Sequence, residues 1–170
     1  GLLAGPGAEG LAGRVVRHLV RWGGEGVSEV ESFIIPSDCP GFESGDAKGL
    51  VKASTRGDDI YIFVDPGNYS VTYNLFGYGN HLSPDDHFQN LLRLIQASSG
   101  RAHRISVIMP SLYGCRQHRR VSRESVDCAS ALPHLRAMGV KNIRTFAAHD
   151  PRVPNAVPLV RLAHGLPTYH

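Results

Sequence analysis

The fold is decided by the stretch Asp59-Ile60-Tyr61-Ile62-Phe63-Val64 of this 170-residue chain. Its residues after Asp59 are all apolar or aromatic, and most favour β-structure. Asp65-Pro66-Gly67 then ends the run. Such a continuous apolar strand is typically covered on both faces, so the stretch predicts an inner strand of a parallel sheet that is flanked by helices.

Short apolar runs and helical patterns alternate on both sides of this strand, which is the order expected for a parallel sheet between helices. The predicted fold is therefore α/β, a three-layer αβα arrangement with a mainly parallel sheet. The further elements expected are a helix over Gly10–Trp22, strands over Glu29–Ile35, Arg104–Met109 and Val140–Phe146, a helix from Ser83, and a helix from Ser122 or Arg123 to Gly139.

The helical patterns also predict which side chains are buried and where the helices begin and end. Ser83 is a good N-cap before Pro84, and Pro133 predicts a kink in the third helix. Apolar residues at helical spacing are expected to face the core. They are Leu11, Val15, Leu19 and Trp22 in the first helix, and Phe88, Leu91, Leu92 and Ile95 in the second.

Two segments match no regular element, and we interpret them as functional loops. They are Pro36–Lys52 and the Gly-, Tyr- and Asn-rich segment Pro66–His81. An alternative remains open for the second, namely an exposed excursion of the chain that its aromatic residues hold in place.

Composition limits the function classes. The length and the 42% hydrophobic content suit a single globular domain. A net charge of +3 suits phosphorylated small molecules and makes a nucleic-acid partner unlikely. Three cysteines without a C-x-x-C pair predict a reducing, cytoplasmic location, and no apolar run is long enough to span a membrane.

The densest cationic cluster is Arg116-Gln117-His118-Arg119-Arg120, between a predicted strand end and a predicted helix start. Loops at the carboxyl ends of parallel strands line the ligand crevice, and guanidinium groups pair with phosphate oxygens. The cluster therefore predicts a polyphosphate site. A solvated basic turn and a patch that follows RNA phosphates remain alternatives.

His149 follows the last predicted strand, in His149-Asp150-Pro151-Arg152 at the same expected edge of the sheet. Its imidazole is a candidate for binding a divalent ion directly or through water, and Arg152 for holding phosphate. A structural histidine is the alternative.

The opening Gly5-Pro6-Gly7-Ala8-Glu9-Gly10 matches G-x-G-x-x-G, but a dinucleotide site also needs a preceding strand and an acid at the end of the next one. Only four residues precede Gly5, and Glu29 and Glu31 stand at the start of the following strand. We interpret the match as coincidental.

Several motifs together resemble the phosphoribosyl pyrophosphate synthetase (ribose-phosphate diphosphokinase) family. Tyr113 with Arg116–Arg120 is similar to its Y-x-x-R-Q-D-[RK]-K segment. The segments Phe42–Asp46 and Ser54–Gly57 are similar to F-S-D-G-E and S-V-R-G, and Thr145–His149 to T-x-D-L-H. The insertion near Asn68–His81 and the wording of the basic segment resemble a divergent bacterial branch found in clostridia.

The resemblance implies that the parent enzyme transfers the β,γ-diphosphoryl group of ATP to the C1 hydroxyl of ribose 5-phosphate, with Mg²⁺ required, giving phosphoribosyl pyrophosphate (PRPP) and AMP. It also implies roles for residues of this chain. Those implied to bind ATP are Arg116, Gln117, Arg119 and Arg120, with Phe42, Ser44 and Asp46 reaching the adenine site of a neighbouring subunit of a homo-oligomer, and His149 is implied to contact the metal-bound triphosphate.

The resemblance further implies that residues 1–170 form one N-terminal, ATP-handling domain and that the C-terminal catalytic domain is absent. No catalytic residue is assigned, and the chain alone is expected to be inactive. Ser44, Asp46, His118 and Ala147 differ from the family's residues at their positions. Ser44 and Ala147 favour a second hypothesis, a catalytically silent homologue that regulates an active synthetase by assembling with it. A basic RNA-binding domain is a third, weaker hypothesis.

Overall fold

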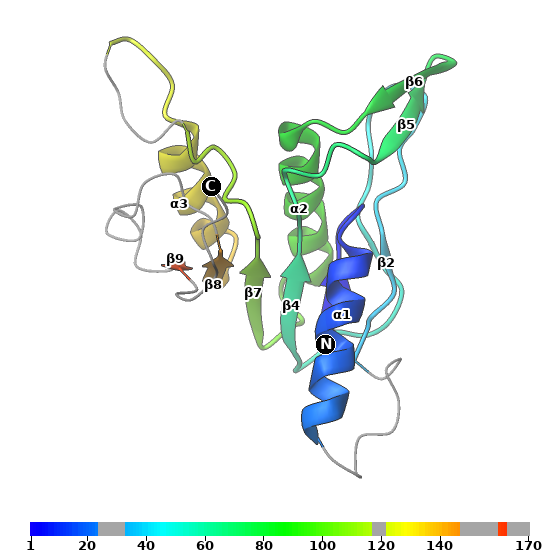
Figure 1. Ribbon diagram of the computed structural model, residues 1–170, viewed down its shortest axis with the longest axis vertical. Helices are drawn as coiled ribbons and strands as arrows, with labels where there is room; N and C mark the ends of the chain where they lie inside the picture. The colour runs from blue at the N-terminus through cyan, green and yellow to red at the C-terminus, as the bar shows by residue number, and fades with distance from the viewer. Residues whose placement is uncertain (24–32, 117–121, 147–159, 163–170) are drawn as a thin grey trace.

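A parallel sheet of five strands forms the centre of the protein, in the order β1-β4-β7-β8-β9 (Figure 1). The computed structural model describes residues 1–23, 33–116, 122–146 and 160–162. All neighbouring strands of this sheet run parallel. The strands are β1 (Leu2–Ala4), β4 (Asp59–Phe63), β7 (Arg104–Ile108), β8 (Val140–Thr145) and β9 (Val160–Leu162).

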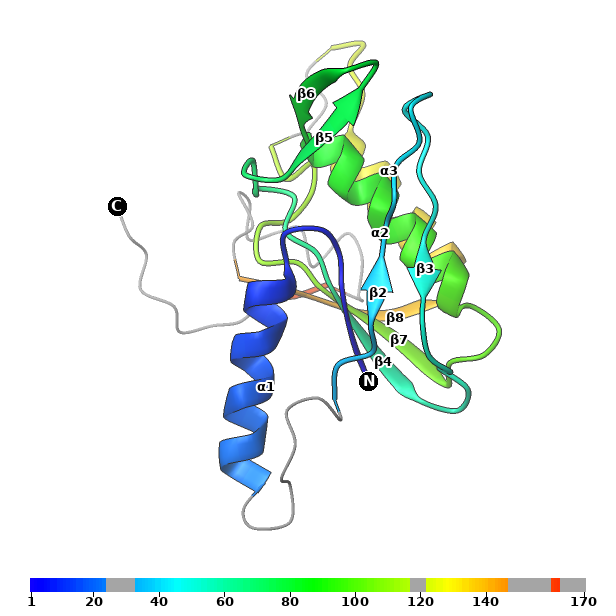
Figure 2. The ribbon, with the colours of Figure 1, turned by 90° about the vertical axis from the view of Figure 1, so that its right-hand side faces the viewer.

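Helices cover both faces of the sheet, which confirms the predicted three-layer αβα fold (Figure 2). Helix α1 (Glu9–Gly23) lies on one face, and α2 (Pro84–Ser98) and α3 (Asp127–Ala137) lie on the other. No helix in the described part of the chain is long and apolar enough to cross a membrane.

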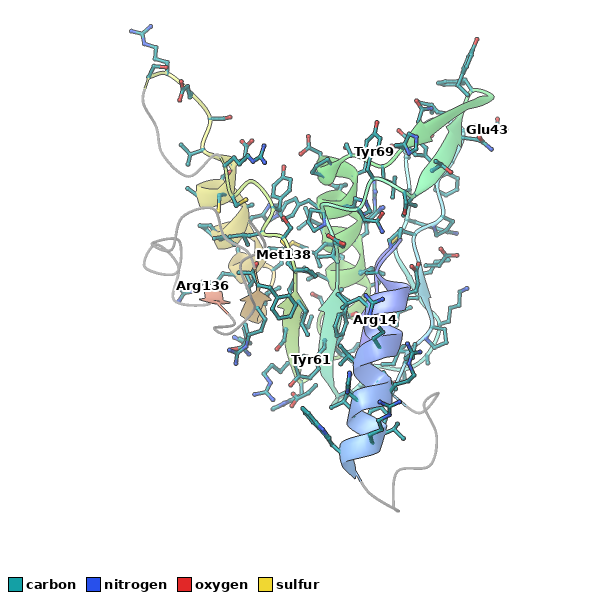
Figure 3. The ribbon with its side chains drawn as sticks, in the orientation of Figure 1. Arg14, Glu43, Tyr61, Tyr69, Arg136 and Met138 are labelled. Carbon is teal, nitrogen blue, oxygen red and sulfur yellow. The ribbon has the colours of Figure 1, made fainter. Side chains whose placement is uncertain are left out.

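Residues on both faces of strand β4 belong to the hydrophobic core. Ile60 and Ile62 are fully buried in the larger cluster with α2 and α3, and Phe63 is buried in the smaller cluster with α1. Coverage on both faces, as the apolar stretch predicts, is therefore confirmed for most of the strand. Tyr61 is the exception: it points to the α1 side and remains exposed (Figure 3).

The buried face of α1 matches the prediction only in part: Leu11 and Val15 are partly buried against the smaller core cluster, but Leu19 and Trp22 are not. Ala12 and Val16 are the fully buried residues of this helix, whereas Leu19 is exposed and Trp22 is 83% exposed. At 1.5 Å per residue the helix is about 22 Å long, roughly twice the length of the three-residue strand β1 beside it. Its last turns extend past the sheet, so Trp22 has no core to enter (Figure 1).

The N-terminal edge of the sheet contains a strand that the sequence reading missed. β1 has only three residues, too few for a recognisable pattern. Residues 33–35 run beside it, with Leu2 N donating to Phe33 O and Ile35 N donating to Leu2 O, but they form only the isolated bridge Leu2–Ile34. The rest of the predicted strand Glu29–Ile35 lies outside the described residues.

The two segments predicted to be irregular each contain an antiparallel strand pair, so that prediction is wrong. Strands β2 (Ser37–Asp38) and β3 (Leu50–Val51) pair within the first segment. Strands β5 (Thr72–Leu75) and β6 (Tyr78–His81) pair within the second. The turn Phe76-Gly77 between β5 and β6 lacks the Asn-Gly or Asp-Gly signal that identifies most tight hairpins.

Helix α3 begins later than predicted, at Asp127 and not at Ser122 or Arg123. The N-cap is Val126, whose side chain cannot cap the helix. Ser122, one of the two predicted starts, instead donates its hydroxyl to Glu124 Oε1 at 3.1 Å. Pro133 lies inside the helix, which ends at Ala137, two residues before the predicted end at Gly139. The kink at Pro133 stays a prediction.

Helix α2 begins as predicted, with Ser83 as its N-cap. The Ser83 hydroxyl accepts from Asp86 N at 3.1 Å, and Asp86 Oδ2 accepts from Ser83 N at 2.8 Å, which completes a capping box. Replacing Ser83 by Ala removes this cap. We expect the free energy of unfolding to fall by about 1 kcal/mol in urea titrations.

The matched control is Ser99→Ala, because Ser99 is exposed at the other end of α2 and contributes its backbone N–H to that cap. We expect this control to change stability by less than about 0.5 kcal/mol. Equal losses in the two variants would contradict the role of the Ser83 side chain.

Candidate functional site

A depression of about 380 Å³ lies where strands β4 and β7 end. Because parallel strands end at the same edge of a sheet, the loops after both strands meet there. The starts of α2 and α3 complete the wall. The lining residues are Pro66 and Gly67 after β4, Pro84 and Asp85 of α2, Ser111 to Arg116 after β7, and Asp127 of α3.

Tyr113 holds the loop after β7 against helix α2. Its ring stacks on Phe88 with centroids 4.3 Å apart, and its hydroxyl donates to Asp85 Oδ1 at 2.7 Å. Burial, and then the Asp85 carboxylate, raise the pKa of Tyr113 to about 12. At neutral pH Tyr113 is therefore a protonated hydrogen-bond donor in the wall of the depression.

The same loop packs closely on the start of α3. Gly114 has φ +65°, and a Cβ there would lie 2.8 Å from Cys128 N, so only glycine fits this position. Cys115 N donates to Leu112 O at 3.3 Å and tightens the turn. The turn delivers Arg116 to the lining of the depression as an exposed side chain.

The described lining carries one positive and two negative side chains, Arg116 against Asp85 and Asp127. The acidic first turn of α2 already offsets the positive end of that helix dipole. A bare polyphosphate would therefore meet repulsion from the carboxylates as well as attraction from Arg116. A polyphosphate that carries a divalent cation matches this mixture of charges better.

The structure places one residue of the predicted basic cluster in the depression, Arg116. Gln117, Arg119 and Arg120 lie outside the described residues, and so does the predicted metal ligand His149. Their convergence with Arg116 on one crevice stays a prediction.

The predicted adenine-contacting residues lie elsewhere. Phe42 and Asp46 line a second depression, of about 180 Å³, between the 41–47 loop, the β5–β6 hairpin and α2. This loop and the Arg116 segment lie on opposite sides of α2, and Glu43 marks the loop (Figures 1 and 3). Among the described residues of one chain, Phe42 and Asp46 are thus not brought together with Arg116.

Side chains of the 41–47 loop interact with one another. Ser44 Oγ donates to Asp46 Oδ2 at 2.9 Å, and Lys48 Nζ lies 5.8 Å from the centre of the exposed Phe42 ring. In this conformation Ser44 and Asp46 are hydrogen-bonded to each other, so a nucleotide base would have to compete for them.

Side chains of the protein itself occupy the space beside the G-x-G-x-x-G turn. Strand β1 does precede it, so the argument that too few residues precede Gly5 is wrong. However, a Cβ on Gly7 would lie 2.5 Å from Val71 and 2.6 Å from Asn68 Nδ2, which donates to Gly7 O at 3.0 Å. A dinucleotide needs this side of the turn open, and Asn68 and Val71 occupy it.

The sequence reading missed Asp85 and Asp127 as lining residues and quoted Tyr113 only as part of a motif. Asp85 and Asp127 stand in the first turns of helices, where an acid is normally explained by the helix dipole. The chain topology could have identified both residues, because α2 and α3 each begin at the edge of the sheet where the parallel strands end.

A parallel sheet between helices, with a charged depression at the carboxyl ends of its strands, is the arrangement typical of ligand-binding α/β domains. One comparison with known proteins identifies the family. The sequence model of the N-terminal domain of ribose phosphate pyrophosphokinase matches residues 1–139. No curated protein sequence matches the chain.

The crystal structure of phosphoribosylpyrophosphate synthetase from Mycobacterium smegmatis has a similar fold, with a TM-score of 0.69 at 17% sequence identity. The match covers 94% of this chain and 46% of that one, so the chain spans about half the length of its structural relative. The chain belongs to the ribose-phosphate pyrophosphokinase family, to which its N-terminal domain model assigns it. Its placement in a clostridial branch stays a prediction.

The Tyr113–Asp85 contact generates a prediction for the pKa of the phenol. Asp85→Asn removes the negative charge that disfavours the tyrosinate, so the pKa of Tyr113 should fall below about 12. It should stay above the ordinary value of 10, because burial is the larger cause. NMR titration of ¹³C-labelled tyrosine measures this, with Tyr113→Phe to assign the signal. An unchanged pKa in the Asn variant would show that the carboxylate does not face the phenol in solution.

Proposed function

We propose that the chain provides the ATP-binding half of a ribose-phosphate diphosphokinase. The complete enzyme would transfer the β,γ-diphosphoryl group of ATP to ribose 5-phosphate, giving PRPP and AMP. The observation that carries this proposal is the position of Arg116 in the depression at the carboxyl edge of the family's fold. Diphosphoryl transfer depends mainly on positioning and on charge neutralisation, and guanidinium groups supply both to phosphates.

Magnesium fits the donors of this depression. In the described ranges no group of three or more His, Cys, Asp or Glu side chains could hold a metal ion alone. Mg²⁺ usually keeps several waters and binds through one or two carboxylates plus substrate phosphates. We propose that Asp85 and Asp127, directly or through water, hold the ion that accompanies ATP, together with His149. The ion would neutralise charge on the polyphosphate.

The second set of nucleotide-binding residues supports a homo-oligomer. Phe42 and Asp46 line a depression separate from that of Arg116 in the same chain. We propose that the 41–47 loop, including Ser44, reaches the adenine of ATP bound by a neighbouring copy, in the cytoplasm. The family resemblance supports this arrangement.

A regulatory role is the second candidate, and the Ser44–Asp46 hydrogen bond favours it. If these side chains stay paired, adenine is recognised poorly. The chain would then act by assembling with an active synthetase and changing its activity, without turnover of its own.

The proposed function predicts that Arg116→Ala weakens binding of Mg-ATP to the purified chain by roughly tenfold or more, since a hydrogen-bonded charge pair is worth about 1.5–3 kcal/mol. Isothermal titration calorimetry measures this. The matched control is Arg14→Ala, an exposed arginine on α1, which should bind as the wild type does (Figure 3).

Identical heats from wild type and Arg116→Ala would defeat the ATP-binding proposal. If the wild type also binds no nucleotide, but changes the activity of an active synthetase when the two are mixed, the regulatory alternative is supported.

The carboxylates of the depression predict the effect of removing the metal. With EDTA, ATP should bind more weakly than Mg-ATP, because Asp85 and Asp127 then face an uncompensated polyphosphate. Asp127→Asn should narrow the difference between the two dissociation constants, since it removes one repelling charge. Asp58→Asn, at the exposed opposite end of β4, should leave the difference unchanged. Equal effects of the two variants would show that Asp127 does not contact the ligand.

A further inference from the structure

The turn of the β5–β6 hairpin contains a residue that suits it poorly. Leu75 pairs with Tyr78, so the loop has two residues, Phe76 and Gly77, with φ of +50° and +82°. Two-residue hairpin loops with positive φ at both positions favour Asn, Asp or Gly at the first. A phenylalanine there is strained, so the turn itself does not favour it.

The strained residue is also exposed. Phe76 is 74% exposed and Tyr78 is 76% exposed, at the tip of a hairpin that projects away from the main sheet (Figures 1 and 2). Neither ring belongs to the two hydrophobic clusters of the core. Among the described residues, neither turn geometry nor core packing accounts for Phe76, so its exposed ring is available to a partner outside this chain.

The hairpin lacks the features that usually prevent exposed edge strands from pairing with another chain. From Pro66 through Pro84 the sequence contains no Asp, Glu, Lys or Arg, and no proline stands between those two. Natural proteins usually protect exposed edge strands with charges, above all lysine, or with proline. β5 and β6 form a sheet of their own, and in the described part of the chain no third strand pairs with it.

The base of the hairpin is firmly anchored, so its tip is presented in a fixed place. Tyr69 stacks on His81 with centroids 4.4 Å apart, and the His81 Nδ1–H donates to Tyr69 O at 2.7 Å (Figure 3). Below this, the buried His87 of α2 donates from Nε2 to Asn68 O at 2.7 Å, and Asn68 in turn donates to Gly7 O. An anchored surface loses less conformational entropy when it binds.

We propose that the β5–β6 hairpin is an interaction surface for a second copy of this chain, with Phe76 and Tyr78 at its centre. The absence of charged residues from the hairpin indicates which partner it suits. A twofold contact places the same patch of both copies face to face, so any net charge on the patch would meet its like. The hairpin has none, whereas a strongly acidic or basic partner would find no complementary charge there. This inference rests on the hairpin and not on the proposed ATP site.

The test compares self-association of the purified chain and its variants by sedimentation velocity over a range of concentrations. Phe76→Asn combined with Tyr78→Thr removes both rings while providing the favoured Asn-Gly turn and a β-forming residue, so the hairpin should still fold. We expect the wild type to self-associate and the double variant to do so at least roughly tenfold more weakly, as for central aromatic residues of an interface.

The control is Trp22→Gln, which removes an aromatic ring that is just as exposed but lies on the far end of α1. We expect it to associate as the wild type does. The proposal is overturned if the wild type is monomeric throughout, if the double variant associates as tightly, or if Trp22→Gln weakens association equally. Circular dichroism checks that each variant is folded. Arg116→Ala leaves the hairpin unchanged and should self-associate as the wild type does, which separates this result from the proposed ATP site.

Discussion

The rest of the structure depends on the parallel pairing of β4 with β7. Their register runs without a shift from Asp59–Arg104 to Phe63–Ile108, so the two strands end level with each other. The loop after β4 and the loop after β7 therefore start at the same height on the same edge of the sheet. This alignment places Gly67 beside the turn that carries Arg116, and it requires the intervening helix α2 to return along one face of the sheet.

Much of the fold could be predicted from the sequence, because its central elements have strong local signals. The apolar run of β4, the Ser83-Pro84 start of α2 and the glycine after α3 each identify one element, and the alternation of strands with helices predicts the three layers. The parts that were missed are governed by tertiary contacts. β1 and β9 have three residues each, and the β5–β6 turn uses Phe-Gly in place of a standard turn pair. Helix α3 begins only after Val126, whose backbone is not helical.

The site could be predicted only in part. Arg116 was found because arginines after a strand end stand out in a sequence. Asp85, Tyr113 and Asp127 did not stand out, because an acid in a first helical turn and a tyrosine in a loop each have an ordinary explanation. Only the three-dimensional arrangement shows that the Tyr113 hydroxyl and the Asp85 carboxylate join α2 to the loop that carries Arg116. The contact of Asn68 with Gly7, which occupies the Gly-rich turn, likewise joins residues far apart in the sequence.

The first turn of α2 serves as a common support for two distant surfaces. Asp85 faces the depression and binds Tyr113, while His87, two residues further on, binds the backbone of Asn68 beneath the hairpin. Asp86 between them fixes the helix end through Ser83. Because both contacts come from the same capped helical turn, the loop after β7 and the foot of the hairpin are held in a fixed position relative to each other.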